Sequence, residues 1–167
     1  MPASAVVKVK QDSTITLQDG TGAPVELVIT YDPKTFSCDE VADLHEEVAI
    51  YAGRTYLGSR KGAAKPVGFS FECYVTSFTS AETTDTEGNP LDFIRRVNGF
   101  SANLNAGTAS YDFPMCGVVL TMEGTELGDL ADSTLTFAKC ALSFSFSADE
   151  PNKFAVTGTC RGGLTYV

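Results

Sequence analysis

The side chains that could support catalysis are few in this chain, and their surroundings match no catalytic pattern. The chain has 167 residues and a single histidine, His45, the side chain type whose ordinary pKa lies nearest to neutrality. His45 lies in the stretch DLHEEV, which lacks the second histidine of a zinc-protease helix. A GxSxG turn that would expose a nucleophilic serine is not present. We therefore interpret His45 as a surface residue and predict that the protein is not an enzyme.

The glycine-rich and acidic stretches give no better match to a ligand site. The segment GSRKGAAKP has glycines and Lys61 but lacks the Gly-Lys-Ser/Thr ending of a phosphate-binding loop. The stretch DGTG after Gln18 is typical of a hairpin turn and lacks the further acidic ligands of a calcium loop. Asp149 and Glu150 lie in a predicted turn with no apolar neighbours to raise their pKa values. We predict no metal and no cofactor.

The five cysteines are best interpreted as thiols of the core. No pair has the CxxC spacing of a zinc or redox site, and their odd number does not suggest a disulfide framework. Three of them, Cys73, Cys140 and Cys160, fall on the apolar faces of predicted strands. The first residues do not show the pattern of a secretory signal, which favours synthesis in a cytoplasm and reduced thiols.

Composition narrows the classes of partner. The net charge of −9 argues against binding to nucleic acid, because such proteins usually carry a basic surface. The sequence lacks a run of about 18 apolar residues, so we expect no membrane-spanning helix. Apolar residues make up 43% of the chain and include 11 phenylalanines, enough to fill the core of one domain.

Residues alternate between apolar and polar in several stretches, and this pattern predicts β-strands. The clearest case lies near the C-terminus, where one face carries Cys140, Leu142, Phe144 and Phe146 and the other carries serines. After the turn ADEPN, the alternation continues through Phe154, Val156 and Cys160. Further strands are predicted in STITLQ, VELVIT, VGFSFECYV, GVVLTMEG and STLTFAKCALSFSFS.

Two short helices are predicted beside these strands. Residues 38–46 follow a capping-box pattern that begins at Ser37, with a strand expected over 47–51. Residues 88–99 begin with Asn89 and Pro90 and end at Gly99, the residues typical of helix ends. We therefore predict a mainly β fold over residues 1–167. It would be one antiparallel β-sandwich or barrel with one or two short flanking helices.

Charge is distributed unevenly along the chain. The segment 52–66 contains Arg54, Arg60, Lys61 and Lys65 and no acidic residue. Because it is rich in glycine and alanine, we expect it to lack regular packing and to form a flexible basic arm. Asp39, Glu40 and Asp43 lie together on the predicted helix 38–46. Either these charges form an ordinary solvated surface, or the arm of one copy binds the acidic patch of the next.

The serines Ser143, Ser145 and Ser147 share the polar face of the predicted strand 133–147. Such a face can simply meet solvent, as in many antiparallel sheets. Small hydroxyl side chains also suit a wall past which DNA moves without binding, because they provide neither cationic nor aromatic contacts.

The layout of the chain resembles the tail tube (major tail) proteins of long-tailed bacteriophages and the related tube proteins of contractile injection systems. The resemblance is carried by the hairpin STITLQDGTGAPVELVITYD and by the basic arm that runs directly into VGFSFECYVTSF. It is also carried by the late strand-strand-turn-strand unit, DSTLTFAKCALSFSFSADEPNKFAVTGTCRGG, which ends in Arg161-Gly162. The segment 79–115, a long loop with its own short helix, departs from that pattern.

The resemblance implies a virion structural protein, made in the host cytoplasm and located in the tail. Its copies would form rings, hexameric in the family, that stack into a tube through which genomic DNA passes without specific binding. Partners would be other copies of the chain and other phage tail proteins. Two alternatives remain: another phage β-sandwich module, such as a head, connector, decoration or adhesin domain, and an enzyme of unrecognised type.

Overall fold

The structure, a computed structural model, describes residues 13–19, 24, 26–29, 35–39, 45–74, 93, 115–125, 131–147 and 153–167. These residues lie almost entirely in ten strands, and every strand pairing is antiparallel. The strands are β1 (Ser13–Gln18), β2 (Glu26–Ile29), β3 (Ser37–Cys38), β4 (His45–Ala52), β5 (Thr55–Ala64), β6 (Val67–Tyr74), β7 (Cys116–Met122), β8 (Ser133–Ser147), β9 (Lys153–Cys160) and β10 (Leu164–Tyr166).

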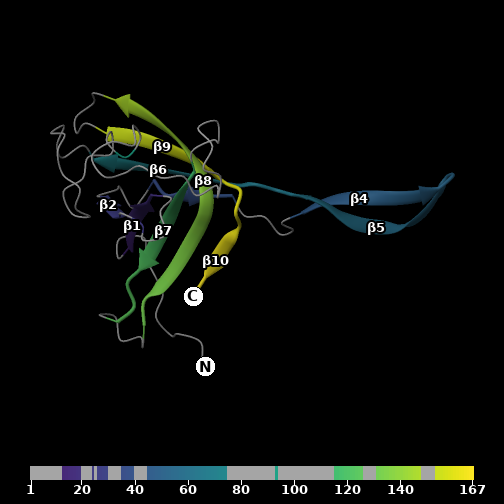
Figure 1. Cartoon of the computed structure of the whole chain (residues 1–167), viewed down its shortest axis with the longest axis horizontal. Helices are drawn as coiled ribbons and strands as arrows, with labels where there is room; N and C mark the ends of the chain where they lie inside the picture. Colours follow the sequence, from purple (N-terminus) through teal and green to yellow (C-terminus); the bar gives the residue numbers. More distant parts are fainter. Residues whose placement is uncertain are drawn as a thin grey trace.

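Eight of the strands form one folded sheet. Its order is β2-β1-β7-β8-β9-β6-β3, and β10 pairs with the first part of β8 on the same side as β9. In Figure 1, β7 and the first half of β8 lie vertically in the view, while β6 and β9 lie across it, so the sheet curls around its buried face. The described strands fit a mainly β sandwich, as predicted, and they do not close into a barrel.

The buried face follows from the alternation of the sequence and from the register of the strands. Ile15 of β1 is opposite Leu120 of β7, and Val118 of β7 is opposite Phe137 of β8. Phe144 of β8 is opposite Val156 of β9. Because paired residues share a face, the apolar side chains of all these strands meet in one core. The prediction that Cys73, Cys140 and Cys160 are core thiols is confirmed, and Cys116 is buried with them.

A β-bulge marks the place where β8 bends. Cys116 is opposite Cys140, whereas Val118 is opposite Phe137, so β8 has an extra residue at this point. Lys139 lies in the bulge with a φ of 52°. The segment between β9 and β10 binds to the bulge, since the Gly162 N–H donates to the Ala138 carbonyl at 2.9 Å. A Cβ atom on Gly162 would lie 2.8 Å from that oxygen, so only glycine fits here.

A glycine on the inner face of β9 leaves space for an aromatic ring of the neighbouring strand. Gly158 of β9 is opposite Phe69 of β6, and a Cβ atom there would lie only 2.1 Å from the Phe69 ring. The ring therefore covers the position where β9 has no side chain. From there it reaches Phe137, with ring centroids 4.8 Å apart. Phe36 approaches Phe137 at 6.5 Å. This cluster joins β6 to β8, which are not neighbours in the sheet.

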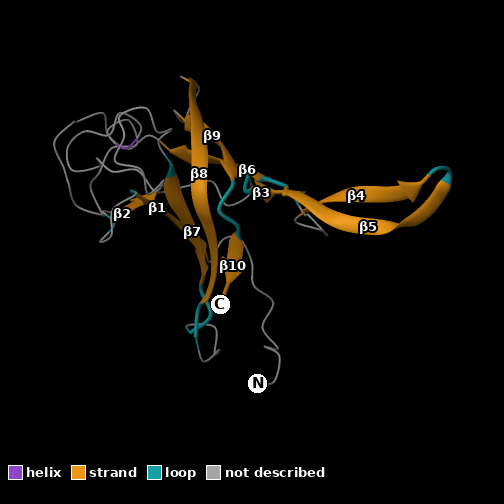
Figure 2. Cartoon of the chain, turned by 45° about the vertical axis from the view of Figure 1, so that its right-hand side comes forward, coloured by secondary structure: helices purple, strands orange, loops and turns teal. Residues whose placement is uncertain are grey.

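Strands β4 and β5 form a separate two-stranded sheet that projects from the body (Figures 1 and 2). The expectation that 52–66 lacks regular structure is wrong, because residues 55–64 are paired along their length with β4. The flexibility of this arm remains a prediction. The sequence alone misled us because glycine and alanine usually weaken strands. Here alternating backbone hydrogen bonds with β4 compensate for that weakness.

The predicted helix 38–46 is wrong wherever the structure describes it. Cys38 lies in β3, and His45 and Glu46 already belong to β4. The residues after Ser37 match a helix-capping pattern, which reflects a local preference only. Ser37 pairs with Ser70 and therefore belongs to the sheet. Residues 40–44 lie outside the described part of the chain. Of the second predicted helix and the predicted loop 79–115, only Phe93, helical and buried, and Met115 are described.

Candidate assembly surface

The β4–β5 hairpin leaves both of its faces exposed. Exposed fractions are 50% for Val48, 60% for Tyr51, 53% for Tyr56 and 65% for Leu57. A two-stranded hairpin is at best marginally stable by itself in water. Large apolar side chains gathered on such an element are typical of a surface that binds another molecule. The hairpin is therefore the strongest candidate for an assembly surface in the described chain.

The tip of the hairpin is a tight two-residue turn. Ala52 is opposite Thr55, so the turn consists of Gly53 and Arg54. Gly53 has a φ of 62°, as the first position of a type II′ turn requires. Behind the turn, the rings of Tyr51 and Tyr56 contact each other edge to face at 5.6 Å. The Gly-X turn between alternating stretches is a signal in the sequence that we did not use and that predicts this hairpin.

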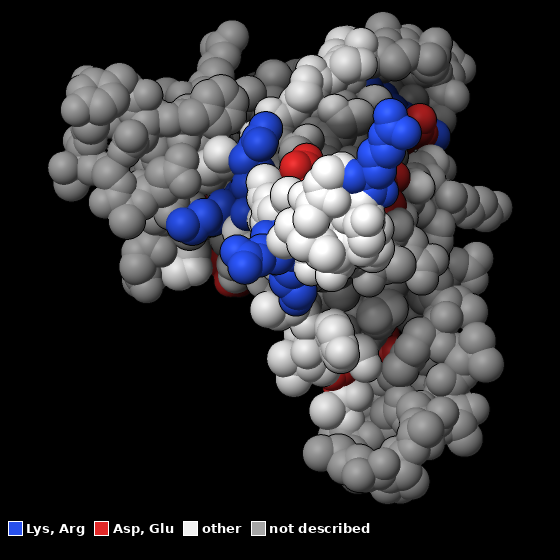
Figure 3. Space-filling model, turned by 90° about the vertical axis from the view of Figure 1, so that its right-hand side faces the viewer, with Lys and Arg blue, Asp and Glu red and all other residues white. Residues whose placement is uncertain are grey.

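The basic residues of the arm are spread over the whole hairpin. Arg54 lies at the tip, and Lys65 follows β5 near the body. Arg60 is opposite Val48, whereas Lys61 is opposite Glu47, so these two adjacent cations lie on opposite faces. Figure 3, which looks at the hairpin end on, shows Lys and Arg side chains around a central uncharged area. The hairpin thus offers apolar and basic groups together.

The acidic patch expected as the partner of the arm is described only at Asp39. Asp39 follows β3, where its N–H donates to the Gly68 carbonyl at 2.8 Å. Glu40 and Asp43 lie outside the described residues. Two further acidic residues, Glu46 and Glu47, lie on β4 within the hairpin itself. Of the three residues proposed as a docking site for the arm, only Asp39 is described, so the acidic docking site remains a prediction.

A row of hydroxyl side chains crosses the outer face of the folded sheet. Ser143 of β8 is opposite Thr157 of β9, which is opposite Ser70 of β6, which is opposite Ser37 of β3. Ser143, Thr157 and Ser37 are exposed, and Ser70 is half-buried. The sequence predicted a serine face on one strand, whereas the structure extends a hydroxyl row over four strands.

The two other predicted serines lie farther along β8. Ser145 is exposed and opposite Ala155, which continues the small-residue character of this face. Ser147 is opposite Lys153 at the end of the strand, and its side chain is outside the described part of the structure. Ser143 and Ser145 therefore share a face, as predicted.

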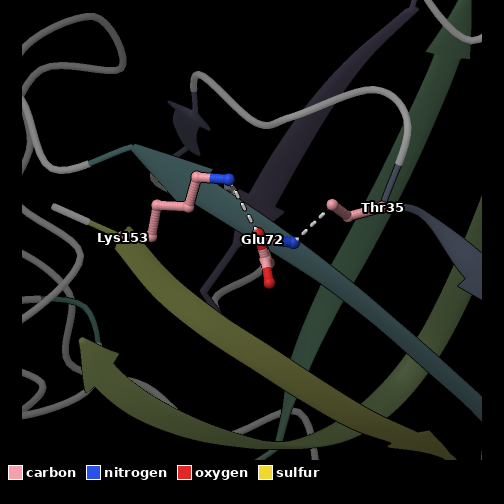
Figure 4. A network of polar contacts seen from close by, with 3 residues as sticks. All are labelled: Thr35, Glu72 and Lys153. Carbon is pink, nitrogen blue, oxygen red and sulfur yellow. Dashed lines mark hydrogen bonds and ion pairs between the residues drawn. The ribbon is translucent and has the colours of Figure 1, made fainter. Parts of the chain in front are cut away.

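The charged groups beside this row neutralise each other. The ammonium group of Lys153 on β9 lies 3.0 Å from a carboxylate oxygen of Glu72 on β6. The same ammonium group lies 5.4 Å from the centre of the Tyr74 ring. Figure 4 shows the pair together with Thr35, whose hydroxyl oxygen accepts a hydrogen bond from the Glu72 N–H at 2.8 Å. The outer face consequently presents no unpaired cation at this point.

A shallow open depression lies at the β3 end of the hydroxyl row. Its volume is about 260 Å³, and its polar lining includes Ser37, Asp39, Ser70 and Thr157. A single carboxylate among hydroxyl groups provides too few ligands for a metal ion. Among the residues that the structure describes, no group of three or more potential metal ligands occurs. No described helix has the length and hydropathy needed to cross a bilayer.

Comparison with known proteins gives a fold likeness without a family assignment. No protein-family model matches the chain, and no curated protein matches it. A chain in the sheath-tube complex of the PVC extracellular contractile injection system, in its extended state, aligns with a TM-score of 0.55 at 10% identity. The alignment covers 100% of this chain and 93% of that one.

A second likeness comes from the same kind of particle. A chain in the sheath/tube terminator of the PVC system, also extended, aligns with a TM-score of 0.54 at 11% identity, covering 100% of this chain and 97% of that one. At these identities the comparisons establish a shared fold over the whole chain.

Proposed function

We propose that this chain is a structural subunit of a tail tube, in which copies form stacked rings, six subunits to a ring. The observation that carries the proposal is the β4–β5 hairpin, which projects from the body with apolar and basic side chains exposed. The whole-chain fold likeness to chains of sheath-tube particles supports it. The protein would be made in the host cytoplasm, would end in the tail of the particle and would contact other tail proteins.

The hairpin would dock on a neighbouring copy. Docking would bury Tyr51, Tyr56 and Leu57, and burying a large apolar side chain contributes about 1.5–3 kcal/mol. With a net charge of −9, each copy offers acidic surface to the cations of the next. Arg54, Arg60, Lys61 and Lys65 remain the proposed contacts on the arm. Asp39, Glu40 and Asp43 remain the proposed acidic partners of these cations.

The hydroxyl face would line the channel. The row of Ser143, Thr157, Ser70 and Ser37 presents small neutral groups, and the cation beside it, Lys153, is paired. Such a wall provides neither the cations that hold phosphates nor exposed aromatic rings on which bases stack. DNA would therefore pass without specific binding. Ser145 and Ser147 would extend the wall along β8.

The test combines electron microscopy with charge reversal on the hairpin. The purified protein is imaged by negative stain and measured by light scattering across a series of protein and salt concentrations. We expect rings or tubes from the unchanged protein. The double variant Arg60→Glu, Lys61→Glu should remain monomeric with an unchanged circular dichroism spectrum. A matched control, Lys139→Glu with Arg161→Glu, makes the same charge change at exposed positions of the body and should still assemble.

Three outcomes would count against the proposal. Normal assembly by the hairpin variant would exclude the hairpin charges as assembly contacts. A stable monomer at every concentration, with a hairpin already protected from hydrogen exchange, would favour the alternative, a β-sandwich binding or decoration module. A tube that assembles but binds DNA tightly at moderate salt would contradict the assignment of the hydroxyl face to the channel.

A further inference from the structure

Three buried cysteines form one row across the bend of the sheet. Cys116 of β7 is opposite Cys140 of β8, and Cys140 is opposite Cys160 of β9. Each is exposed by only 1–2%. The row lies beside the bulge at Lys139, where the segment between β9 and β10 binds to β8. The sequence spacing of the cysteines gave no hint of this arrangement, which depends on the strand register.

The hydrogen-bond pattern indicates that the Cα atoms of two of these cysteines lie closer together than those of a hydrogen-bonded strand pair. The Arg161 N–H donates to the Lys139 carbonyl at 3.1 Å, so these residues form a hydrogen-bonded pair. In an antiparallel ladder the adjacent pair, Cys140 and Cys160, is then of the non-hydrogen-bonded type. Such pairs have Cα atoms about 4.5 Å apart, which lies within the range that a disulfide spans.

The thiol of Cys140 donates to the Phe137 carbonyl at 3.3 Å, and that of Cys160 faces the carbonyls of Ala138 and Gly163, both at 3.1 Å. The two thiols also shift each other's pKa. The hydrogen bond between the thiols raises the pKa of Cys140, and burial adds to this rise. The same hydrogen bond lowers the pKa of Cys160 to about 6. Cys160 is therefore the thiol that ionises first, and the thiolate is the form that reacts with oxidants.

The third thiol of the row also faces a backbone carbonyl group. The sulfur of Cys116 donates a hydrogen bond to the carbonyl oxygen of Cys140 at 3.4 Å. The register between β7 and β8 also shifts next to Cys116, whereas β8 and β9 stay in register along their whole length. Geometry thus favours the pair Cys140–Cys160 over the pair Cys116–Cys140.

We propose that Cys140 and Cys160 form a redox modification site, at which a hydroperoxide converts the two thiols into a disulfide between β8 and β9. Hydrogen peroxide is small enough to reach thiols beside the exposed segment Arg161–Gly163 during local opening. The inference rests on the strand register and does not depend on the proposed function. It applies to any setting in which the protein leaves a reducing cytoplasm.

The reaction takes two balanced steps. The thiolate of Cys160 attacks one oxygen of hydrogen peroxide, the O–O bond breaks, and the departing hydroxide takes up a proton as water. The resulting sulfenic acid is then attacked by the sulfur of Cys140, the S–O bond breaks, and a second water leaves. Two thiols and one peroxide give one disulfide and two waters.

The disulfide would fasten the bend of the sheet. It would join β8 just beyond the bulge to the end of β9, where Arg161–Gly163 lead to β10. The loop that it closes contains the turn between the two strands and constrains the unfolded chain. We expect the midpoint of thermal unfolding to rise by roughly 5–10 °C on oxidation, reversibly with dithiothreitol.

The experiment treats the folded protein with hydrogen peroxide, quenches it, and alkylates all remaining thiols in denaturant before mass spectrometry. We expect three of the five thiols to remain alkylatable and peptide mapping to find Cys140 linked to Cys160. The matched control Cys116→Ser should still form the link, whereas Cys140→Ser and Cys160→Ser should not. Peptide mapping of the unchanged protein needs no variant, so it decides the question even if a serine variant fails to fold.

Three results would overturn the proposal. One is five unreacted thiols after exposure to peroxide under native conditions. Another is a link that joins Cys116 to Cys140. The third is oxidation only to sulfinic or sulfonic acid at single cysteines, which would mean that the two sulfur atoms do not reach each other.

Discussion

The folded sheet and the β4–β5 hairpin have the same backbone pairing but opposite surroundings. In the sheet, Ile15, Leu17 and Phe137 are completely buried, so alternation separates a core face from an outer face. In the hairpin, residues on both faces are exposed, including Val48 and Leu57. Strand pairing alone therefore does not decide stability. The sheet is stabilised by its own core, whereas the hairpin has large apolar side chains whose burial requires another molecule.

The sharpest way to test this contrast is to truncate one apolar side chain in each region. Phe137→Ala should lower the free energy of unfolding by about 3–5 kcal/mol, because the ring is fully buried against Phe36 and Phe69. Leu57→Ala in the hairpin should change it by less than about 0.5 kcal/mol in the monomer. Chemical denaturation followed by circular dichroism measures both. Equal losses would mean that the hairpin belongs to the folding core of the monomer.

Hydrogen exchange tests the same contrast without mutation. Amides of β4 and β5 should exchange at least ~100-fold faster than those of β6, β8 and β9 in the monomer, because few buried contacts resist local opening. In an assembled particle the hairpin amides should become protected while the sheet amides change little. Exchange measured by mass spectrometry on both samples would contradict the contrast if hairpin protection were already high in the monomer.

Substitution of one glycine in each region tests the same contrast with smaller expected losses of stability. Gly158→Ala should lower the free energy of unfolding by about 1–3 kcal/mol, because the added methyl group collides with the buried Phe69 ring. At the hairpin tip, Gly53→Ala meets no atom, and only its positive φ opposes the change. Thermal unfolding of the two variants should show the larger loss at Gly158. A larger loss at Gly53 would show that the turn, rather than the core, limits stability.

The smallest expected effect concerns pH and the connection between β7 and β8. The Asp132 carboxylate accepts hydrogen bonds from the N–H groups of Thr125 and Gly124, at 3.1 and 3.0 Å, which lowers its pKa to about 2. Because the folded pKa lies below the unfolded value, the carboxylate stabilises the fold above about pH 4, and this stabilisation is lost as the pH falls through about 2.

The variant Asp132→Asn provides the check. It should be slightly less stable than the unchanged protein at pH 7, and the two should converge as the pH approaches 2. Thermal unfolding midpoints across this pH range measure the difference. A difference that stays constant with pH would mean that the hydrogen bonds, and not the charge, matter at this turn.

The strands of the folded sheet were largely predictable from the sequence. For the candidate surfaces, the sequence identified some of the residues but not how they are arranged. Strand β8 and its partner β9 occupy the residues predicted for them, because alternation over many residues is a local and strong signal. The basic residues Arg60 and Lys61 were identified, but their separation onto opposite faces follows only from pairing with β4. The hydroxyl row from Ser143 to Ser37 joins strands that are more than a hundred residues apart in sequence.

The sequence by itself determined most strands of the folded sheet and which side of each is apolar, because both depend on neighbours one and two positions away. Only the tertiary structure decided which strands are adjacent. That choice put Ser37 in a strand instead of at the cap of a helix, placed Cys140 next to Cys160, and left β4 and β5 paired only with each other. The physical reason is that register and adjacency are set by long-range burial of the whole apolar face, which no local window of sequence contains.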